Sequence, residues 1–357
     1  MKTLTEITTF AGGMPPQMVL ELGRIEVGRG REELHRTQAP QVLERLAVQT
    51  RYESITASSA IENVIVPPER ALHLVRPGGP ARARDRSERE LAGYRDAVDH
   101  LVRGEGGRLD LDRVLQLHRL LMRHVDGASA GRLKAEDNLI ADRLAQGGSS
   151  VVFRAVPAGQ TERQMSVLLG AYEAAVDDAV VHPLVLVAAL VLDLLSIHPF
   201  ADGNGRVARL VTTGELLRHG YGIARYVSLE QRIYDTRNSY YRALRQSQAG
   251  WHDGRHDLWP WAGYLFSLLS DAYDDFEARV LCSRALHGAT KEEHVRDYAL
   301  NHAPERFSFA QVSAALPDIS GPTIRNALNR LRAEGRLAVG RGRSARWTRL
   351  PEKEPAI

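Results

Sequence analysis

The sequence has only one cysteine, Cys282, among its 357 residues. A single cysteine excludes an internal disulfide, and a reducing compartment is its natural setting. Long apolar runs are also missing. The longest, residues 184–192, is interrupted by Asp193 and is far shorter than the roughly 20 residues that a membrane-spanning helix needs. Residues 1–7 lack the apolar segment of a secretory signal, so we expect a cytoplasmic protein without a membrane partner.

Acidic residues are almost absent from one stretch near the C-terminus. The whole chain has a formal net charge of +3, with 47 basic and 44 acidic residues. Residues 321–349 contain eight arginines and one acid, Glu334, which leaves 39 bases and 43 acids in the rest of the chain. A local charge of +7 on an otherwise slightly acidic protein indicates a C-terminal module that binds an anion, most plausibly nucleic acid.

Helical patterning dominates the chain between its first and last segments. Residues 1–45, which include Gly12-Gly13 and Pro15-Pro16, are predicted to form a loosely structured arm. Pro67-Pro68 ends the first predicted helix, and residues 77–86 are predicted to be a linker. Apolar periodicity predicts helices over residues 43–61, 87–102, 111–124, 161–176, 184–197, 204–217, 229–248 and 258–281.

Two regions depart from this helical pattern. Between residues 126 and 159 the periodicity fails, and Gly147-Gly148 followed by Val151–Phe153 predicts a loop and a short strand, one arm of a small hairpin. From about residue 291, three short helices precede a basic hairpin that turns at residues 340–343. Ser308 and Ser320 are predicted to cap the last two helices, the second of which buries Ile324, Leu328 and Leu331.

The segment His198-Pro-Phe-Ala-Asp-Gly-Asn-Gly-Arg-Val-Ala-Arg209 has the composition of an anion site. A glycine-flanked turn that opens a helix exposes backbone N–H groups, and the helix dipole adds positive charge. Arg206 and Arg209 are three residues apart and can reach one polyphosphate. Asp202 offers a hard oxygen for Mg²⁺, and His198 is a proton acceptor near neutral pH. The combination predicts phosphoryl or nucleotidyl transfer.

This segment also resembles the signature of the Fic family, H-P-F-x-[D/E]-G-N-G-R-x-x-R, at every fixed position. The resemblance implies a protein adenylyltransferase that uses ATP and Mg²⁺ to transfer AMP to a Ser, Thr or Tyr hydroxyl of a target protein or of itself. His198 would act as the general base and Asp202 as the metal ligand, with Phe200 anchoring the loop. The nucleotide would bind to Gly203, Asn204, Gly205, Arg206 and Arg209.

A second, shorter pattern lies in the first predicted helix. Ser58-Ser-Ala-Ile-Glu62-Asn63 is similar to the family's inhibitory motif, [S/T]-x-x-x-E-[G/N]. The resemblance implies that Glu62 pairs with Arg209 in the place of the γ-phosphate, with Ser58 and Asn63 completing the motif. The alternative is an ordinary helix end, where Glu62 is exposed and Asn63 is a C-cap.

The C-terminal residues resemble a winged helix, an appendage of many bacterial Fic proteins. Its second capped helix would enter the major groove of DNA, and the basic hairpin would contact phosphates. The predicted DNA-binding residues are Arg325, Asn326 and Asn329 on the helix and Arg341 and Arg343 in the wing. Winged helices also serve as protein-docking or dimerisation modules, which keeps a homodimer open.

The expected fold is mainly α-helical: a Fic-type bundle with a small β-hairpin flap and a C-terminal winged helix-turn-helix domain. The expected divisions are residues 1–85 for the arm and inhibitory helix, 86–285 for the core, 286–350 for the winged helix and 351–357 for a tail. Two alternative functions remain: a DNA-binding regulator whose core senses nucleotide, and a Fic enzyme that removes AMP or transfers another nucleotidyl group.

Overall fold

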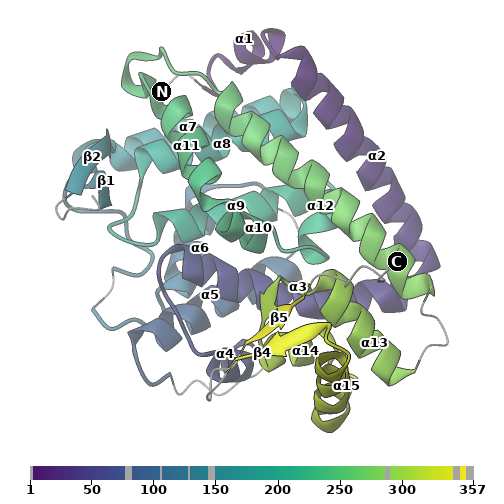
Figure 1. Ribbon diagram of the computed structural model, residues 1–357. Helices are drawn as coiled ribbons and strands as arrows, with labels where there is room; N and C mark the ends of the chain where they lie inside the picture. Colours follow the sequence, from purple (N-terminus) through teal and green to yellow (C-terminus); the bar gives the residue numbers. More distant parts are fainter. Residues whose placement is uncertain are drawn as a thin grey trace.

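The chain is described by a computed structural model over residues 3–76, 83–104, 107–127, 129–143, 149–285, 290–340 and 346–350. Helices make up most of the described chain, and the two sheets are small (Figure 1). The helices are α1 (Ile7–Gly12), α2 (Pro16–Gln38), α3 (Pro40–Ile61), α4 (Pro68–Val75), α5 (Arg86–Arg103), α6 (Leu111–Leu121), α7 (Ala158–Asp178), α8 (Pro183–Ile197), α9 (Asn204–Arg218), α10 (Leu229–Asp235), α11 (Arg237–Gln248), α12 (Trp259–Ala285), α13 (Lys291–Asp297), α14 (Phe309–Ala315) and α15 (Gly321–Ala333). Three short turns, η1 (Gly222–Arg225), η2 (Trp251–Asp253) and η3 (Tyr298–His302), and strands β1 (Leu139–Arg143), β2 (Ser149–Arg154), β3 (Arg306–Phe307), β4 (Leu337–Val339) and β5 (Trp347–Arg349) complete the set.

Helix α8 is the centre of the main hydrophobic core. Every residue from Leu184 to Ile197 is buried, including Asp193, which accepts hydrogen bonds from Thr3 and Trp251. A helix that is apolar on all sides must be covered on all sides. Helices α7, α9, α11 and α12 pack around α8 and provide that cover. The predicted helix over residues 184–197 is therefore confirmed, and its buried end fixes where the next loop begins.

The N-terminal segment is ordered, so the prediction of a loosely structured arm over residues 1–45 is wrong. Pro16 and Pro40 each lie in the first turn of a helix, where proline is favoured, rather than interrupting one. Helix α2 packs along α12 because Gly28 allows close approach: a Cβ there would lie 2.5 Å from Cγ of Tyr273. Glu32 of α2 also accepts a hydrogen bond from the Tyr273 hydroxyl at 3.1 Å. Contacts made far along the chain, rather than local periodicity, stabilise this helix.

The predicted hairpin is present beside the main bundle. Strands β1 and β2 pair antiparallel, from Leu139 opposite Arg154 to Arg143 opposite Ser149. The register shifts between Ile140 and Ala141, as at a β-bulge. The Gly147-Gly148 turn expected from the sequence lies outside the described residues. In Figure 1 the hairpin projects from the edge of the bundle.

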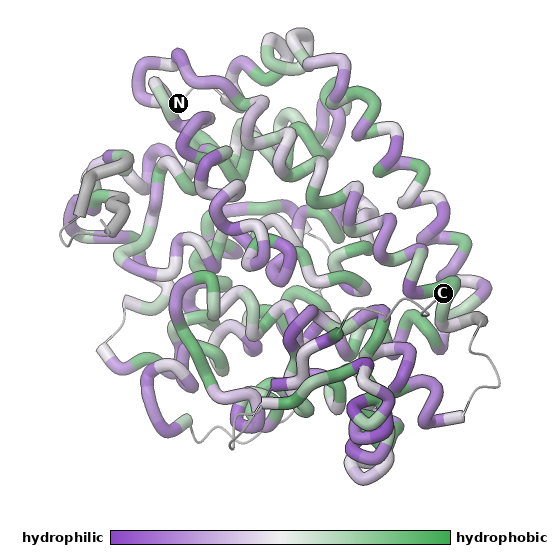
Figure 2. The backbone as a smooth tube through the Cα atoms, viewed as in Figure 1, coloured by the Kyte–Doolittle hydropathy of each residue, from purple (hydrophilic) through white to green (hydrophobic). Residues whose placement is uncertain are grey.

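The C-terminal residues form a module with its own apolar core. Helices α13, α14 and α15 surround Val295, Phe307, Ile324, Leu328 and Leu331, and a three-stranded sheet in the order β3-β5-β4 closes it. The predicted caps are confirmed, because the Ser308 and Ser320 side chains accept hydrogen bonds from the third backbone N–H of their helices. Figure 2 shows that α15, at the lower edge, is largely hydrophilic on its outer side.

The module packs against helices α3 and α4. Helix α14 packs against α3 and α4, and the Gln49 side chain of α3 donates a 3.3 Å hydrogen bond to the Tyr298 hydroxyl of η3. Within the described ranges, none of the helices combines the length and the apolar character needed to cross a membrane.

Candidate functional site

The loop between α8 and α9 depends on two left-handed backbone positions. His198, which ends α8, has φ 53°, and Gly203, which precedes α9, has φ 81°. A Cβ at Gly203 would lie 3.0 Å from a Leu121 methyl group, so both the conformation and the space favour glycine. The six residues 198–203 therefore connect α8 to α9, and His198 and the start of α9 line the same cavity.

Asn204 and Phe200 hold this loop closed. The Asn204 amide accepts a 2.9 Å hydrogen bond from the Phe200 N–H and donates a 2.7 Å hydrogen bond to the Phe200 carbonyl. Phe200 itself is fully buried and stacks on the His118 ring at 3.8 Å between centroids. The predicted anchoring of the loop by Phe200 matches this position. Because its amide is used within the loop, Asn204 reaches a ligand through its backbone.

His118 also supports the loop from α6, a contact that the sequence did not reveal. The N–H of Gly131 donates to Nδ1 of His118, so Nε2 carries the proton and donates to the Asp202 carbonyl at 3.2 Å. Burial lowers the pKa of His118 to about 4. The ring is therefore neutral at physiological pH, as its one-donor, one-acceptor pattern requires.

The segment from Lys134 to Asn138 supports the other side of the loop. The Lys134 ammonium donates to the Ile197 carbonyl at 3.1 Å, and the Asn138 amide donates to the Phe200 carbonyl at 2.9 Å. Burial lowers the pKa of Lys134 to about 8. These two side chains satisfy backbone carbonyls that the tight turn leaves without helical partners.

A cavity of about 610 Å³ opens above the loop, a volume typical of sites that hold drug-sized or nucleotide-sized ligands. Its floor is the turn and the start of α9, where no side chain of the described residues caps the helix. The free N–H groups of such a helix start attract anions. The walls come from the end of α3 and the two residues after it, from α8, the loop, α9 and α11. They consist of Ile61, Glu62, Asn63, Leu195, His198, Asp202, Arg209, Arg237, Tyr240, Tyr241, Leu244, Arg245 and Gln248.

His198 lines the cavity in the form that a general base requires. Its Nδ1 lies 3.3 Å from the Leu195 carbonyl, which can only accept, so Nδ1 carries the proton. The remaining nitrogen, Nε2, is left with its lone pair. Burial, with a smaller effect from the nearby Lys134 charge, lowers the pKa of His198 to about 4. The imidazole is therefore neutral at physiological pH, with its proton on Nδ1 and a lone pair on Nε2.

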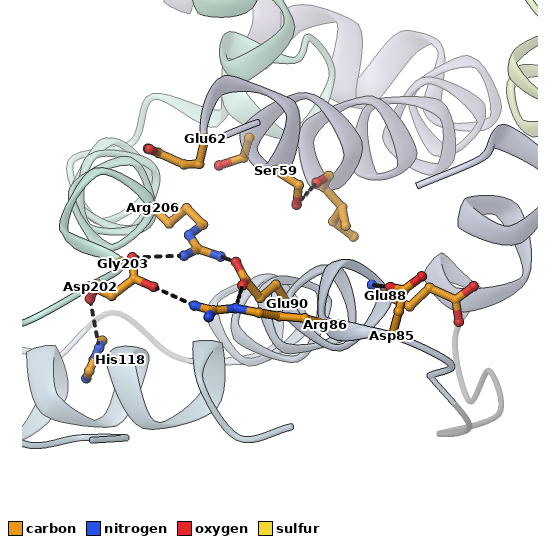
Figure 3. Close-up of polar contacts among 12 residues, drawn as sticks. Ser59, Glu62, Asp85, Arg86, Glu88, Glu90, His118, Asp202, Gly203 and Arg206 are labelled. Atoms are coloured by element: carbon orange, nitrogen blue, oxygen red, sulfur yellow. Dashed lines mark hydrogen bonds and ion pairs between the residues drawn. The ribbon is translucent and has the colours of Figure 1, made fainter. Parts of the chain in front are cut away.

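Arg206 and Asp202 belong to a network of charged side chains that also includes Arg86 and Glu90 of α5 (Figure 3). The Arg206 side chain is 2 % exposed and donates to Glu90 of α5 at 2.6 Å. Asp202 is half exposed and lies 3.5 Å from Arg206 and 3.3 Å from Arg86. Arg86 also donates to Glu90 at 2.7 Å. Figure 3 shows Arg206 reaching toward Glu90 and Asp202, away from Glu62, and Arg206 does not line the cavity.

Arg209, by contrast, faces the cavity and is paired with the α3 helix end. Its guanidinium donates to the Ser58 hydroxyl at 2.9 Å, to the Ser58 carbonyl at 3.1 Å and to the Glu62 carboxylate at 2.9 Å. Burial by itself would lower the pKa of Arg209, but the Glu62 charge raises it overall. The contact between Glu62 and Arg209 expected from the motif is present, and Glu62 and Asn63 also form the end of helix α3.

Gly205 and Asn63 make room for that contact. A Cβ at Gly205 would lie 2.3 Å from Oε1 of Glu62, so only glycine lets the carboxylate approach the start of α9. Asn63 has φ 61°, a left-handed conformation that asparagine tolerates and that turns the chain after Glu62. The carboxylate therefore lies over the same helix start that would attract an anion.

The predicted DNA-binding residues lie together on α15. Arg325, Asn326 and Asn329 are exposed, and the Arg325 guanidinium lies 4.9 Å from the centroid of the Phe309 ring. Arg330, on the same helix, is paired with Glu292 at 2.7 Å. Arg341 and Arg343, the predicted wing residues, lie outside the described residues.

Part of this chain, including the loop between α8 and α9, is similar to known sequences. The profile of the Fic/DOC family matches residues 108–216. The protein adenylyltransferase Fic of Nematostella vectensis is 25 % identical over 186 residues, which are 52 % of this chain and 38 % of that protein. The protein of the same name from Aedes aegypti is 30 % identical over 116 residues, 32 % of this chain and 20 % of that protein. The chain therefore matches well under half the length of these relatives.

Solved structures share the fold. A Fic family protein from Desulfovibrio desulfuricans G20 has a TM-score of 0.60 at 24 % identity, with 96 % of this chain and 98 % of that chain covered. Fic-1 (residues 134–508) of C. elegans has a TM-score of 0.57 at 20 % identity, with 74 % of each chain covered. Fold and site together define a mainly helical protein in which an uncapped helix start lies beside a histidine. The part of the chain that matches the Fic/DOC family is residues 108–216.

Proposed function

We propose that this chain is a protein adenylyltransferase that transfers AMP from ATP to a hydroxyl of a protein side chain. One observation carries the proposal: His198, with Nε2 unprotonated, lines a nucleotide-sized cavity built on the N-terminus of α9. The names of the curated relatives support the same chemistry. A base beside a polyphosphate site is what attack of a hydroxyl on the α-phosphorus requires.

In this reaction Nε2 of His198 takes the proton of the target hydroxyl as its oxygen attacks the α-phosphorus. The backbone N–H groups of Asn204 and Gly205 bind the α-phosphate oxygens, because both residues line the cavity at the uncapped start of α9, whereas the N–H of Gly203 donates to Asp202. Arg209 binds the γ-phosphate once Glu62 has moved. Arg206 is paired with Glu90 and Asp202 and does not line the cavity, so we propose that it positions Asp202 rather than contacting the nucleotide directly.

The residues around Asp202 fit a magnesium ion. Asp202 offers a half-exposed carboxylate beside the turn, and Mg²⁺ prefers one or two carboxylates together with phosphate oxygens. Its partner Arg86 is itself 69 % exposed, so that arginine can give way to a cation at little cost. A bound Mg²⁺ would offset the charge of the phosphates, while the residues of this chain position the nucleotide and accept the proton.

We further infer that Glu62 inhibits the reaction from within the chain. The γ-phosphate and the Glu62 carboxylate would compete for the same guanidinium, because Arg209 is 4 % exposed and cannot turn to serve both. Glu62 also lies within reach of Gly205 at the start of α9. While Glu62 is paired with Arg209, the γ-phosphate of ATP cannot reach that arginine. The α-phosphorus is then not in line with the attacking hydroxyl of the target.

We propose that an extended segment of the target protein binds along the hairpin of β1 and β2. This would bring the target hydroxyl to the cavity. The open edge of a hairpin can accept a further strand by main-chain hydrogen bonds. In chain order the hairpin lies between the segment 134–138, which supports the loop, and α7.

A direct test uses labelled ATP with Mg²⁺ on the parent, Glu62→Gly and His198→Ala proteins. Transfer of label that rises in Glu62→Gly and disappears in His198→Ala supports both proposals. Equal labelling of parent and Glu62→Gly removes the inhibitory role alone. Absence of label in every protein contradicts the transferase assignment and favours a nucleotide sensor, and release of AMP from a modified protein favours the reverse reaction.

For the C-terminal module we propose a winged-helix DNA-binding function, favoured by the exposed row of Arg325, Asn326 and Asn329 on α15. The order of three helices and a small sheet is that of winged helices, and α15 contacts only elements of its own module among the pairs with several contacts. A module that dimerises two chains instead would show a concentration-dependent mass and no DNA binding.

A further inference from the structure

A cluster of three side chains lies where the C-terminal module meets the main core. Cys282 comes from α12, Asp297 ends α13 and His302 ends η3. Sγ of Cys282 is 3.0 Å from Oδ1 of Asp297, and Nε2 of His302 is 3.1 Å from Oδ2 of the same residue. One sulfur, one imidazole nitrogen and one carboxylate oxygen all lie within 4.8 Å of one another.

These three atom types are the ones that zinc takes in proteins. Zn²⁺ binds thiolate at about 2.3 Å, and imidazole and carboxylate at about 2.0–2.2 Å, in a tetrahedron. From those bond lengths, ligand atoms in such a site are about 3.3–3.7 Å apart. At present the Cys282 sulfur is 3.0 Å from Oδ1 of Asp297 and the His302 nitrogen is 3.1 Å from Oδ2. The sulfur, the nitrogen and one carboxylate oxygen all lie within 4.8 Å of one another, so rotations of the three side chains can bring them to the separations of a zinc site.

A cavity beside the cluster gives a metal ion access from solvent and leaves room for a water molecule as the fourth ligand. A cavity of about 250 Å³ is lined by Asp297 and His302 on one side and by Leu46 and Gln49 of α3 on the other. A tetrahedral site with three protein ligands keeps its fourth position for water. The Asp297 and His302 side chains are each 15 % exposed, so the ligand atoms are sheltered without being closed off.

We propose that Cys282, Asp297 and His302 bind a divalent cation of the zinc class, with water from the adjacent cavity as the fourth ligand. As the metal–sulfur bond forms, the Cys282 thiol releases its proton to solvent, and the neutral imidazole binds through Nε2. Cobalt(II), nickel(II) and copper(II) share this preference for nitrogen and sulfur, whereas Mg²⁺ does not.

Such an ion would connect the module to the core. Cys282 lies on the long helix α12, while Asp297 and His302 belong to the module, and residues 286–289 between them are outside the described part. A metal bridging these elements stabilises the attachment of the module beside α3. The proposal is independent of nucleotide transfer, because none of its ligands lines the cavity above His198.

The test is a cobalt titration of the full-length protein after treatment with a chelator, without nucleotide. Because Cys282 is the only cysteine in the chain, a thiolate-to-cobalt charge-transfer band has one possible source. We expect this band with one Co²⁺ bound per chain, together with the intense visible bands of a tetrahedral site, and their loss on addition of Zn²⁺. Absence of the band at saturating Co²⁺ overturns the proposal and leaves a hydrogen-bonded cluster.

Variants assign the ligands. Cys282→Ser should abolish the charge-transfer band, and His302→Gln should weaken Co²⁺ binding more than about 100-fold, since even outer-shell changes cost 10–100-fold. His294→Gln is the matched control, because His294 lines the same cavity outside the cluster. Zn²⁺ should raise the unfolding temperature of the parent and of His294→Gln but not of Cys282→Ser. An equal rise in all three contradicts the assignment, and the parent band decides the question if a variant fails to fold.

Discussion

The catalytic loop and the C-terminal module both concentrate arginine, but they use it in opposite ways. Arg206 and Arg209 are 2 % and 4 % exposed, and carboxylates of α5 and α3 hold them. Arg325 is exposed and has an aromatic ring, rather than an acid, beneath its guanidinium. A buried, paired arginine can bind an anion only if its carboxylate partner is displaced, so the partner can regulate anion binding. An exposed arginine binds any nearby phosphate and confers affinity that salt weakens.

The largest effect on AMP transfer should come from replacing His198, the proposed general base. His198→Ala should lower AMP transfer about 10²- to 10⁴-fold, the usual cost of losing a general base, while ATP binding changes little. Label transfer and nucleotide binding by calorimetry measure the two quantities. His100→Ala, an exposed histidine of α5, is the control. Equal loss in both variants would argue against a specific role for His198.

The control exerted by the buried arginine should be the next largest effect. A hydrogen bond to a charged group is worth about 1.5–3 kcal/mol, so Glu62→Gly should raise transfer roughly 10- to 100-fold. Glu62→Gln, which keeps the shape and loses the charge, should give a smaller rise. Glu69→Gly, an exposed glutamate at the start of α4, should leave the rate unchanged. A rise in the control variant as well would point to general loosening of the fold.

The buried, neutral His118 that packs against the loop should make the stability of the folded protein depend on pH. Burial lowers the pKa of His118 from 6.5 to about 4, so the folded protein binds fewer protons than the unfolded chain between these values. The free energy of unfolding is therefore unaffected by protonation of His118 above pH 6.5 and falls by about 3 kcal/mol as the pH is lowered from 6.5 to 4. His118→Asn should show a smaller loss over this window in urea unfolding. Parallel pH profiles for the two proteins would contradict the buried, neutral ring.

The exposed arginine should give the smallest and least specific effect. Arg325→Ala should reduce the slope of log affinity against log salt for duplex DNA by about 1, as expected for one lost phosphate contact. Fluorescence anisotropy at several salt concentrations measures the slope. Arg24→Ala, an exposed arginine of α2 away from the module, should leave it unaltered. Should the parent show no salt-dependent binding, the module has another partner and the contrast between the two regions fails.

The parts of the site that are contiguous in the sequence could be predicted from the sequence alone. His198 to Arg209 form one turn and one helix start, so residue types alone predicted a phosphate site there. Glu62 was identifiable because Ser58 and Asn63 surround it within one helix end. Its distance from Arg209, 2.9 Å, depends on the packing of α3 over α9, which the motif implies only by resemblance.

The supporting residues could not be predicted, because nothing in their own neighbourhoods marks them. Glu90 lies on a helix with many other charges, and its pairing with Arg206 joins positions 116 residues apart. His118 faces Phe200 and Asp202 only through packing of α6 on α9. The same holds for α2, whose order comes from its contact with α12 rather than from a strong local pattern. Long-range packing overrides weak local preference in each case.

A crystal structure of Glu62→Gly with Mg²⁺ and a non-hydrolysable ATP analogue tests the central claim most directly. We predict the triphosphate lying on the start of α9, its γ-phosphate on Arg209, and Nε2 of His198 beside the line of attack on the α-phosphorus. A nucleotide bound elsewhere, or an empty turn with Arg209 still held by Ser58 alone, would contradict the account.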